Sequence, residues 1–252
     1  MTTTRARIAG QVGVVLALFA IWEIGARTDL IDVFHFGSPS GIADVLGAWS
    51  IEPKIFSDIG ATLVVFACGW ALGVVLGVLI GAALAASRTA HEIASPFLAF
   101  LNATPRMVFY PFFGLALGFS TFSKIGLVVF VIVVFVIFDV LAGLQTIDRS
   151  LVDNVRVSGG RRVDVIREVY VPSLIGSLIT SSRITVAFAL QATLISEFFG
   201  PAEGLGHRIV AGQGAFRVDE VWAAIFITLI IAILLDGALQ VLRARATTWR
   251  AG

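Results

Sequence analysis

The chain has 252 residues, of which 58% are hydrophobic and only 14% are charged, whereas about 25% of the residues of an ordinary soluble domain are charged. This composition excludes a disordered chain and a collagen-like rod, and the single cysteine, Cys68, excludes a disulfide scaffold. The net charge of +1 gives no sign of a nucleic-acid surface. We therefore expect an all-α integral membrane protein.

A helix of roughly 20 apolar residues crosses the hydrocarbon core of a bilayer, and the sequence predicts six such spans in one domain, residues 1–252. They lie at roughly 8–25, 60–86, 94–119, 124–146, 173–199 and 221–242. The first span follows Arg5 and Arg7, as the apolar part of a signal peptide does, but no clean small-residue cleavage site comes after it. We expect it to remain as an uncleaved span.

Residues 26–58 connect the first two spans and contain an amphipathic stretch near Ile42 to Trp49. This stretch is either a helix that lies at the membrane interface or one turn of helix in a connecting loop. The sequence leaves both alternatives open.

Glycine recurs at every fourth position of the second span. The four glycines are Gly69, Gly73, Gly77 and Gly81. Because this spacing leaves one face of the helix without side chains, the backbone of another helix can approach it closely. We expect this face to pack against a helix, in the same subunit or in a second one, and not to bind a ligand.

The third span contains Pro105 and Pro111, so it cannot be one regular helix. Broken backbone at membrane depth needs protein or a water-filled cavity beside it, and polar groups at that depth are functional by default. We therefore expect this span, together with polar groups of the fifth span, to line a path for a solute. The candidate path residues are Asn102, Pro105, Arg106, Phe109, Tyr110, Pro111, Arg183 and Gln191.

Simpler explanations exist for several of these charges. Arg106 is as consistent with snorkelling to the inner interface as with a role in a path. Arg183 can pair with Asp139 within the membrane, and Glu197 lies so near the outer end of its span that it carries little weight.

The distribution of basic residues sets the orientation of the spans. With the N-terminus in the cytoplasm, eleven basic residues lie inside and five lie outside, Lys124 among the latter. We therefore expect both termini to be cytoplasmic.

The segment 147–172 between the fourth and fifth spans is rich in charge, with five arginines and four acids including Asp148. Asp164 and Arg161 lie at a spacing that allows helical pairing. Gly159-Gly160 divides the segment into two short helices, and Pro172 is suited to begin the fifth span. Such a loop is more structured than a linker, and we expect another cytoplasmic protein to grip it.

Residues 150–172 resemble the "EAA" loop of the permease subunits of bacterial ABC importers. Gly159 follows the Asp153-Asn154-Val155 triplet at the family's spacing, and Pro172 comes thirteen residues after that glycine. The matching positions are Asp153, Asn154, Val155, Arg156, Gly159, Arg162 and Pro172. The triplet replaces the family's Glu-Ala-Ala, and Val169 and Val171 replace its isoleucine and leucine.

Two further segments resemble the nitrate/sulfonate/taurine-type permeases, namely 96–126 in the third span and 197–206, Glu-Phe-Phe-Gly-Pro-Ala-Glu-Gly-Leu-Gly. Arg183 also stands where that subfamily commonly has arginine. Together the similarity covers about residues 38–242 and implies the type I ABC importer fold in a bacterial inner membrane.

The resemblance implies a mechanism with separate partners. A second copy of this chain or a related permease would complete the pore, and an extracytoplasmic binding protein would deliver a small solute, an anion of the nitrate/sulfonate/taurine type. ABC ATPase subunits would bind the loop and carry ATP and magnesium, since this chain has no G-x-x-x-x-G-K-[ST] phosphate loop. The remaining partner is membrane lipid; we expect no nucleic acid, cofactor or metal on this chain.

Two other classes of protein fit less well. An ion-coupled secondary transporter would use intramembrane acids on facing repeats, but no internal repeat is clear. A membrane enzyme lacks support because His91-Glu92 has no second histidine to complete H-E-x-x-H and no G-x-S-x-G occurs.

Overall fold

The structure is a computed structural model that describes residues 2–248, and within this range it contains helices and no strand. The all-α prediction is therefore confirmed. The side chains of residues 2–5, 8 and 242–248 are not described either. Arg5 and the C-terminal arginines of the positive-inside pattern thus lie outside the described side chains.

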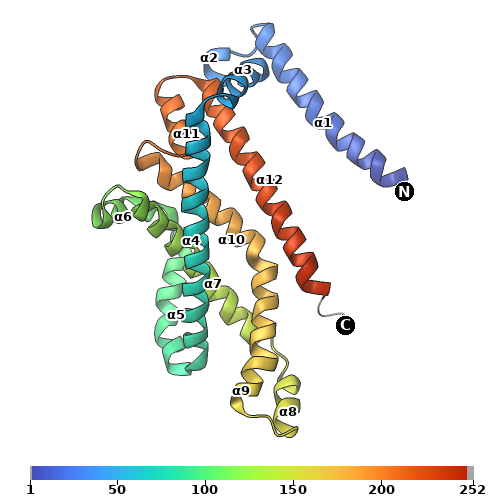
Figure 1. Cartoon of the computed structure of the whole chain (residues 1–252), viewed down its shortest axis with the longest axis vertical. Helices are drawn as coiled ribbons and strands as arrows, with labels where there is room; N and C mark the ends of the chain where they lie inside the picture. The colour runs from blue at the N-terminus through green and yellow to red at the C-terminus, as the bar shows by residue number, and fades with distance from the viewer. Residues whose placement is uncertain (1, 249–252) are drawn as a thin grey trace.

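The helices run in a simple order from α1 to α12, with one 3₁₀ turn (η1) and one π turn (η2). They are α1 Thr2–Arg27, α2 Val33–Phe36, α3 Pro39–Ser50, α4 Pro53–Ala86, α5 Arg88–Ala103, η1 Arg106–Phe109, α6 Tyr110–Leu117, α7 Thr121–Gln145, α8 Arg149–Val157, α9 Arg162–Val165, η2 Ile166–Tyr170, α10 Val171–Phe199, α11 Leu205–Gly214 and α12 Val218–Thr248. Figure 1 shows α3 and α11 at one end of an elongated bundle and α8 and α9 at the other.

Five helices of the described chain are long and apolar enough to cross a membrane. They comprise residues 9–27, 53–86, 121–145, 162–199 and 218–241. The 34 residues of α4 begin at Pro53, well before the predicted boundary at residue 60, because Pro53 suits the first turn of a helix.

The third predicted span, 94–119, is not among these five. The chain forms α5, which begins at Arg88 after the capping hydroxyl of Ser87, and α5 stops before Pro105. A 3₁₀ turn and the short helix α6 follow, with Pro111 in the first turn of α6. The prediction of a break at the prolines is confirmed, but the predicted start of the segment is wrong.

The most extensive helix packing in the described chain is between α4 and α7. The four glycines of α4 lie against four branched side chains of α7 that repeat with the same spacing. The pairs are Gly69 with Val128, Gly73 with Ile132, Gly77 with Val136 and Gly81 with Val140. A Cβ on Gly73 would lie 2.7 Å from the Cβ of Ile132, so only glycine permits this separation. The contact is within one subunit, and α7 packs against α10 as well.

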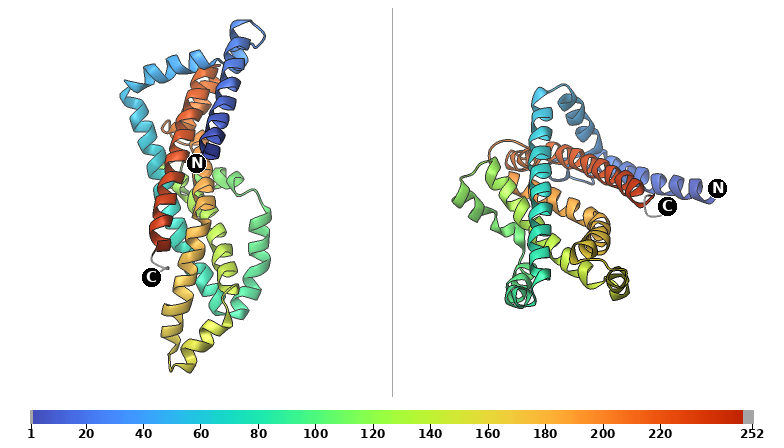
Figure 2. Two further views of the ribbon diagram at one scale, coloured as in Figure 1. Left: turned by 90° about the vertical axis from the view of Figure 1, so that its right-hand side faces the viewer. Right: turned by 60° about the horizontal axis from the view of Figure 1, so that its bottom comes forward.

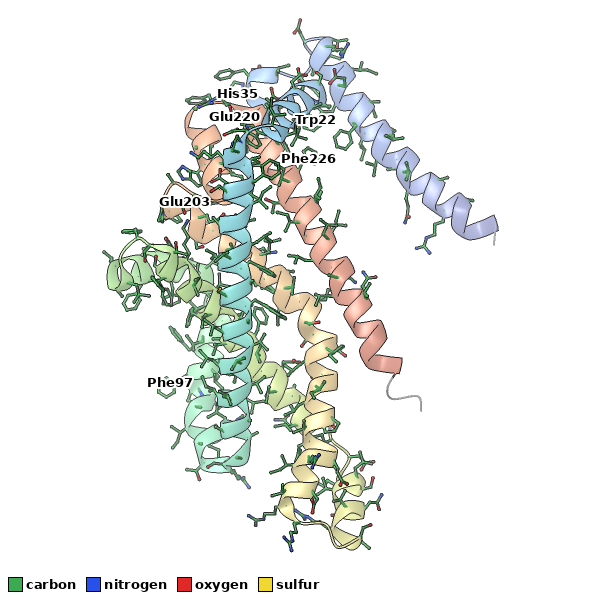
Figure 3. The ribbon with its side chains drawn as sticks, in the orientation of Figure 1. Trp22, His35, Phe97, Glu203, Glu220 and Phe226 are labelled. Carbon is green, nitrogen blue, oxygen red and sulfur yellow. The ribbon has the colours of Figure 1, made fainter. Side chains whose placement is uncertain are left out.

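At the end of the bundle that holds α3, aromatic side chains join α1 to α12. The rings of Trp22 and Trp222 are 5.3 Å apart, and Figure 3 shows Trp22 and Phe226 at this junction. Ile42 and Trp49 of α3 are buried in the same cluster. The amphipathic stretch is therefore a 12-residue helix packed on α12, not a single turn.

Beyond this junction, α1 runs apart from the rest of the bundle, as Figure 1 shows, and its N-terminal end extends past the other helices in the right-hand view of Figure 2. Its apolar side chains are exposed there, Leu16 and Leu18 each by 63%. In a membrane, this surface needs lipid or another protein chain beside it.

Candidate functional site

Two polar regions lie at opposite ends of α10. The first is the segment from Arg149 to Tyr170, which comprises α8, α9 and η2 and which we call the arginine hairpin. Asp148 caps α8 by accepting a 2.9 Å hydrogen bond from the backbone N–H of Ser150. This hydrogen bond holds the pKa of the exposed Asp148 carboxyl below its usual value.

Gly159 forms the turn of the arginine hairpin with φ at 82°. This left-handed conformation strains any residue that has a Cβ. Gly160 donates its N–H to the carbonyl oxygen of Val155 at 2.9 Å and so closes the end of α8. The predicted division at Gly159-Gly160 is confirmed, but only α8 is a separate short helix, because α9 continues through η2 into α10.

The side chains of the arginine hairpin point largely into solvent. None of its five arginines forms an ion pair with a described residue. The predicted pairing of Asp164 with the Arg161 side chain is wrong: the Asp164 carboxylate accepts the backbone N–H of Arg161 at 2.7 Å and caps α9. Two apolar side chains are exposed beside these charges, Val157 by 89% and Val163 by 68%.

The seven residues that resemble the "EAA" loop lie in or directly after this hairpin. Asp153, Asn154, Arg156, Gly159 and Arg162 are exposed, while Val155 and Pro172 are half-buried. Between the start of α8 and α10 is a cleft of about 540 Å³, lined in part by Leu151, Ser177 and Thr180. Thus α8 projects from the bundle, and no residue of α8 is buried.

The arginine hairpin is continuous with α10. Residues Arg162–Phe199 form one 38-residue helical segment. Pro172 lies in the first turn of α10, as predicted, but α9 and η2 lead into this turn without a break. Proline inside an α-helix lacks an N–H and clashes with the carbonyl four residues earlier. In the π turn just before Pro172, the backbone N–H of Val171 donates to the carbonyl oxygen of Ile166, five residues earlier. This longer hydrogen-bonded ring widens the helix at this point.

The second region, which we call the polar cluster, consists of Glu52, Asp58, Thr62, Lys124, Glu197 and Arg208. Glu197, near the far end of α10, is fully buried. Its Oε2 accepts hydrogen bonds from the Thr62 hydroxyl at 3.1 Å and from the backbone N–H of Gly206 at 2.8 Å. Glu197 thus fixes the far end of α10 to α4 and to α11.

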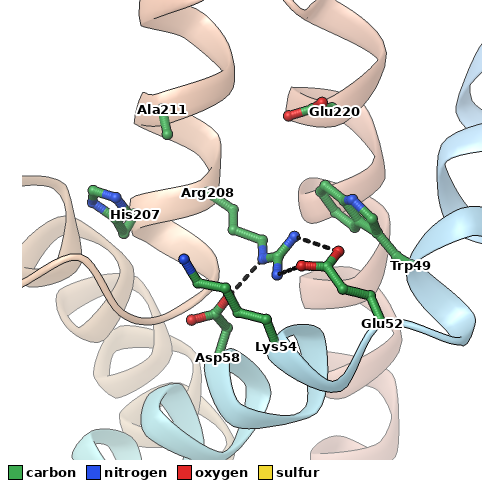
Figure 4. Close-up of a pocket in the computed structure, with 8 residues that line it drawn as sticks. All are labelled: Trp49, Glu52, Lys54, Asp58, His207, Arg208, Ala211 and Glu220. Atoms are coloured by element: carbon green, nitrogen blue, oxygen red, sulfur yellow. Dashed lines mark hydrogen bonds and ion pairs between the residues drawn. The ribbon is translucent and has the colours of Figure 1, made fainter.

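Arg208 of α11 joins two carboxylates of the α4 end in Figure 4. Its Nε lies 2.6 Å from Asp58, its Nη2 lies 3.0 Å from Glu52, and its guanidinium lies over the ring of Trp49. Burial alone lowers the pKa of Arg208, but the hydrogen bonds to both carboxylates outweigh burial and raise it above its ordinary value. A cavity of about 150 Å³ beside this group also contacts His207.

Lys124, near the start of α7, is buried in the same region. Its Nζ donates to the carbonyl oxygens of Glu203 at 3.1 Å and Pro201 at 3.4 Å. The polar cluster thus fastens the loop 200–206 to both α4 and α7.

The eight candidate path residues do not gather into one site. Arg106 and Phe109 are half-buried at the break in the third span, where Phe109 contacts Phe130 at 5.5 Å. Tyr110 is fully buried in the core, so it does not line a path in this conformation. The exposed members are Asn102, Pro105, Pro111, Arg183 and Gln191.

The suggested ion pair between Asp139 and Arg183 does not form. Arg183 instead pairs with Asp236 of α12 at 2.6 Å. Asp139 accepts hydrogen bonds from the hydroxyls of Ser177 at 3.1 Å and Ser181 at 2.5 Å. The two serines lie six and two residues before Arg183 on α10, and their hydroxyls reach Asp139 in its place.

Comparison with known proteins gives a consistent result. Residues 73–248 match the family of binding-protein-dependent transport system inner membrane components. The formylaminopyrimidine transport permease protein ThiX of Halalkalibacterium halodurans is 28% identical over 93% of each chain. SsuC of Bacillus subtilis, a permease protein named for aliphatic sulfonate transport, is 23% identical over 92% of this chain and 84% of its own.

The fold is also found among solved structures. A chain of the methionine ABC transporter MetNI, in an inward-facing conformation, aligns with a TM-score of 0.68 at 17% identity. The alignment covers 78% of this chain and 98% of that one.

Proposed function

This chain belongs to the inner membrane components of binding-protein-dependent transport systems, and we propose that it forms, with a second permease copy, the path by which a small anion enters the cell. The chain is a multi-pass permease subunit of an ABC importer. The proposal adds the solute class, the pairing of two permeases, and the points at which the other subunits act.

The observation that carries the proposal is the exposed surface of the arginine hairpin. Its five arginines have no ion pair with any described side chain, and Val157 and Val163 are exposed on the same hairpin. Apolar side chains ringed by charge are typical of a protein interface. We assign this surface to the ATPase subunits, which would place the hairpin and both termini in the cytoplasm.

The helix that follows the hairpin can transmit a movement of the hairpin to the other end of the bundle. Arg162–Phe199 contains 38 residues, or about 57 Å at 1.5 Å per residue. Its far end holds Glu197, which is bonded to Thr62 of α4 and to the first turn of α11. Tilting of the hairpin by closing ATPases would therefore move the opposite end, as alternating access requires. The binding protein would dock at that end, where α3 and α11 lie.

The anionic solute is supported by arginine at membrane depth and by the sulfonate-named relative. The names of other relatives refer to a formylaminopyrimidine and to riboflavin. Within this chain, the arginine that can attract an anion is one whose charge no carboxylate balances.

The test is uptake and ATP hydrolysis by the complete assembly, with ATPases and binding protein, in proteoliposomes. Gly159→Val strains the hairpin turn, and Asp153→Lys reverses a charge on its exposed face. We expect both variants to lower uptake per ATP hydrolysed while the assembly still inserts. Gly118→Val is the matched control, because Gly118 also has a positive φ of 72° and open space around it but lies far from the hairpin.

Normal coupling in both hairpin variants would contradict the assignment of the ATPase contact. Uptake that needs an ion gradient, and no ATPase subunit, would instead favour the secondary-transporter alternative.

A further inference from the structure

Charged side chains within the spans are nearly all compensated by a partner. Arg183 pairs with Asp236, and the carboxylate of Asp139 accepts two serine hydroxyls. Glu197 and Lys124 each bond to polar groups in the polar cluster. Compensation is expected, because an isolated charge away from water is costly.

Arg106 is the exception among the described in-span charges. It forms no hydrogen bond or ion pair with a described residue, and its Nη1 is buried without a partner. Its one electrostatic contact is with an aromatic ring: the guanidinium carbon lies 4.1 Å from the ring centroid of Phe135. Arg106 as a whole is half-buried, so its Nη1 is held against protein while the rest of the side chain remains partly accessible.

The Phe135 ring supports the guanidinium from one side. Phe135 in turn contacts Phe188 of α10, with ring centroids 4.3 Å apart, so the cation rests on a layer contributed by α7 and α10. A guanidinium stacked by its face keeps its N–H donors in the plane, at its edge. Those donors match the paired oxygens of a carboxylate, sulfonate or similar oxyanion.

The position of Arg106 suits a ligand contact. It begins η1, directly after Pro105, at the break between α5 and α6. The half-buried rings of Phe109 and Phe130 lie in contact beside this break. A charged donor next to aromatic surface fits an organic anion, whose head pairs with the guanidinium while its apolar part contacts the rings.

We propose that Arg106 is the residue of the translocation path that contacts the solute, and that the solute is an organic anion with a carboxylate or sulfonate head. This deepens, and rests on, the proposed function. Arg183, which stands at the position shared with the resembled subfamily, has its charge balanced by Asp236 and serves to join α10 to α12.

The first test measures protection from an arginine reagent. The complete assembly in nanodiscs is treated with phenylglyoxal, and modification of each arginine is followed by peptide mass spectrometry. Ethanesulfonate and propionate are the anionic probes, and ethyl methyl sulfone and propionamide are their neutral counterparts.

We expect the anions to slow modification of Arg106 about tenfold, the factor that a charge-assisted hydrogen bond is typically worth. The neutral compounds should not slow it. Arg183 and the outward-lying Arg217, exposed by 62% and 64%, serve as internal references that no probe protects. Protection of Arg106 by neither anion, or equally by the neutral compounds, would overturn the proposal.

The second test separates this inference from the proposed function. Uptake of ethanesulfonate and propionate by the complete assembly should fall about tenfold or more in Arg106→Gln, and Arg106→Lys should retain more uptake than Arg106→Gln because it keeps the charge. Arg217→Gln is the control. If Arg106→Gln transports both probes as the unmodified chain does while Gly159→Val is uncoupled, the inference fails and the proposed function stands.

Discussion

The polar cluster and the arginine hairpin occupy opposite ends of one continuous helix, and the surroundings of their charges differ completely. In the polar cluster, Asp58 and Glu197 are buried and bonded to α4, α10 and the loop before α11. In the arginine hairpin, α8 has no buried residue and its arginines have no ion pairs with described residues.

In the polar cluster, the chain itself supplies the partners of the charged groups. In the arginine hairpin, those partners would come from another chain. Buried charges are tolerated only where their partners are already in place. Exposed arginines beside exposed valines are suited to contacts with another protein chain. Substitutions should therefore damage folding at one end and assembly at the other, and the two ends can be tested against each other.

The largest effect on stability is expected from Arg208→Ala. This change leaves the Asp58 carboxylate, 3% exposed, without its guanidinium partner and also frees Glu52. Breaking a buried ion pair on one side costs about 3–5 kcal/mol. The measurement is the free energy of unfolding of the isolated chain in mixed detergent micelles.

Arg217→Ala is the matched control, since Arg217, just before α12, is 64% exposed and pairs with Glu220 in the first turn of that helix. Its removal should cost less than about 1 kcal/mol. Equal losses for the two variants would mean that the polar cluster does not hold this end together.

A smaller loss is expected from Gly73→Ala in the packing of α4 on α7. The new Cβ would lie 2.7 Å from that of Ile132, so the two helices must separate slightly. Overpacking of this kind costs about 1–3 kcal/mol. The same unfolding measurement tests it.

Gly60→Ala on the same helix provides the comparison, because no atom lies within 4 Å of its added Cβ. There the higher helix propensity of alanine should raise stability by up to about 1 kcal/mol. A Gly73→Ala variant as stable as Gly60→Ala would show that the glycine face is not closely packed.

The smallest effect on the fold is expected from Arg156→Glu in the arginine hairpin. Arg156 is exposed and has no ion pair among the described residues, so the free energy of unfolding should change by no more than about 0.5 kcal/mol. Co-purification of the ATPase subunits should nevertheless fall. If Arg156→Glu destabilised the fold but left ATPase binding unchanged, the hairpin would serve folding and not assembly.

Local sequence signals predicted much of this architecture. Pro105 and Pro111 determine the break in the third span, and Gly159 determines the turn of the hairpin, because each acts on its own backbone. The register of Gly69 to Gly81 likewise indicated a packing face, although only the structure identifies α7 as its partner.

The polar cluster could not be predicted in the same way. Thr62 and Glu197 are 135 positions apart in the chain, and Lys124 meets carbonyl oxygens 77 and 79 positions away. One signal was present: Glu197 is an acid in an apolar span, directly before a glycine-rich segment that supplies free N–H groups. The wide turn before Pro172 had no sequence signal beyond the proline itself.

The most direct test of the ATPase contact is site-specific photocrosslinking in the complete, transport-active assembly. Benzoylphenylalanine replaces Val157, the most exposed apolar residue of the hairpin, or Ile51, which is 85% exposed at the opposite end. We predict that position 157 crosslinks to an ATPase subunit and that position 51 does not. An active assembly in which position 157 yields no ATPase crosslink, or in which position 51 yields one, would contradict the assignment of the arginine hairpin.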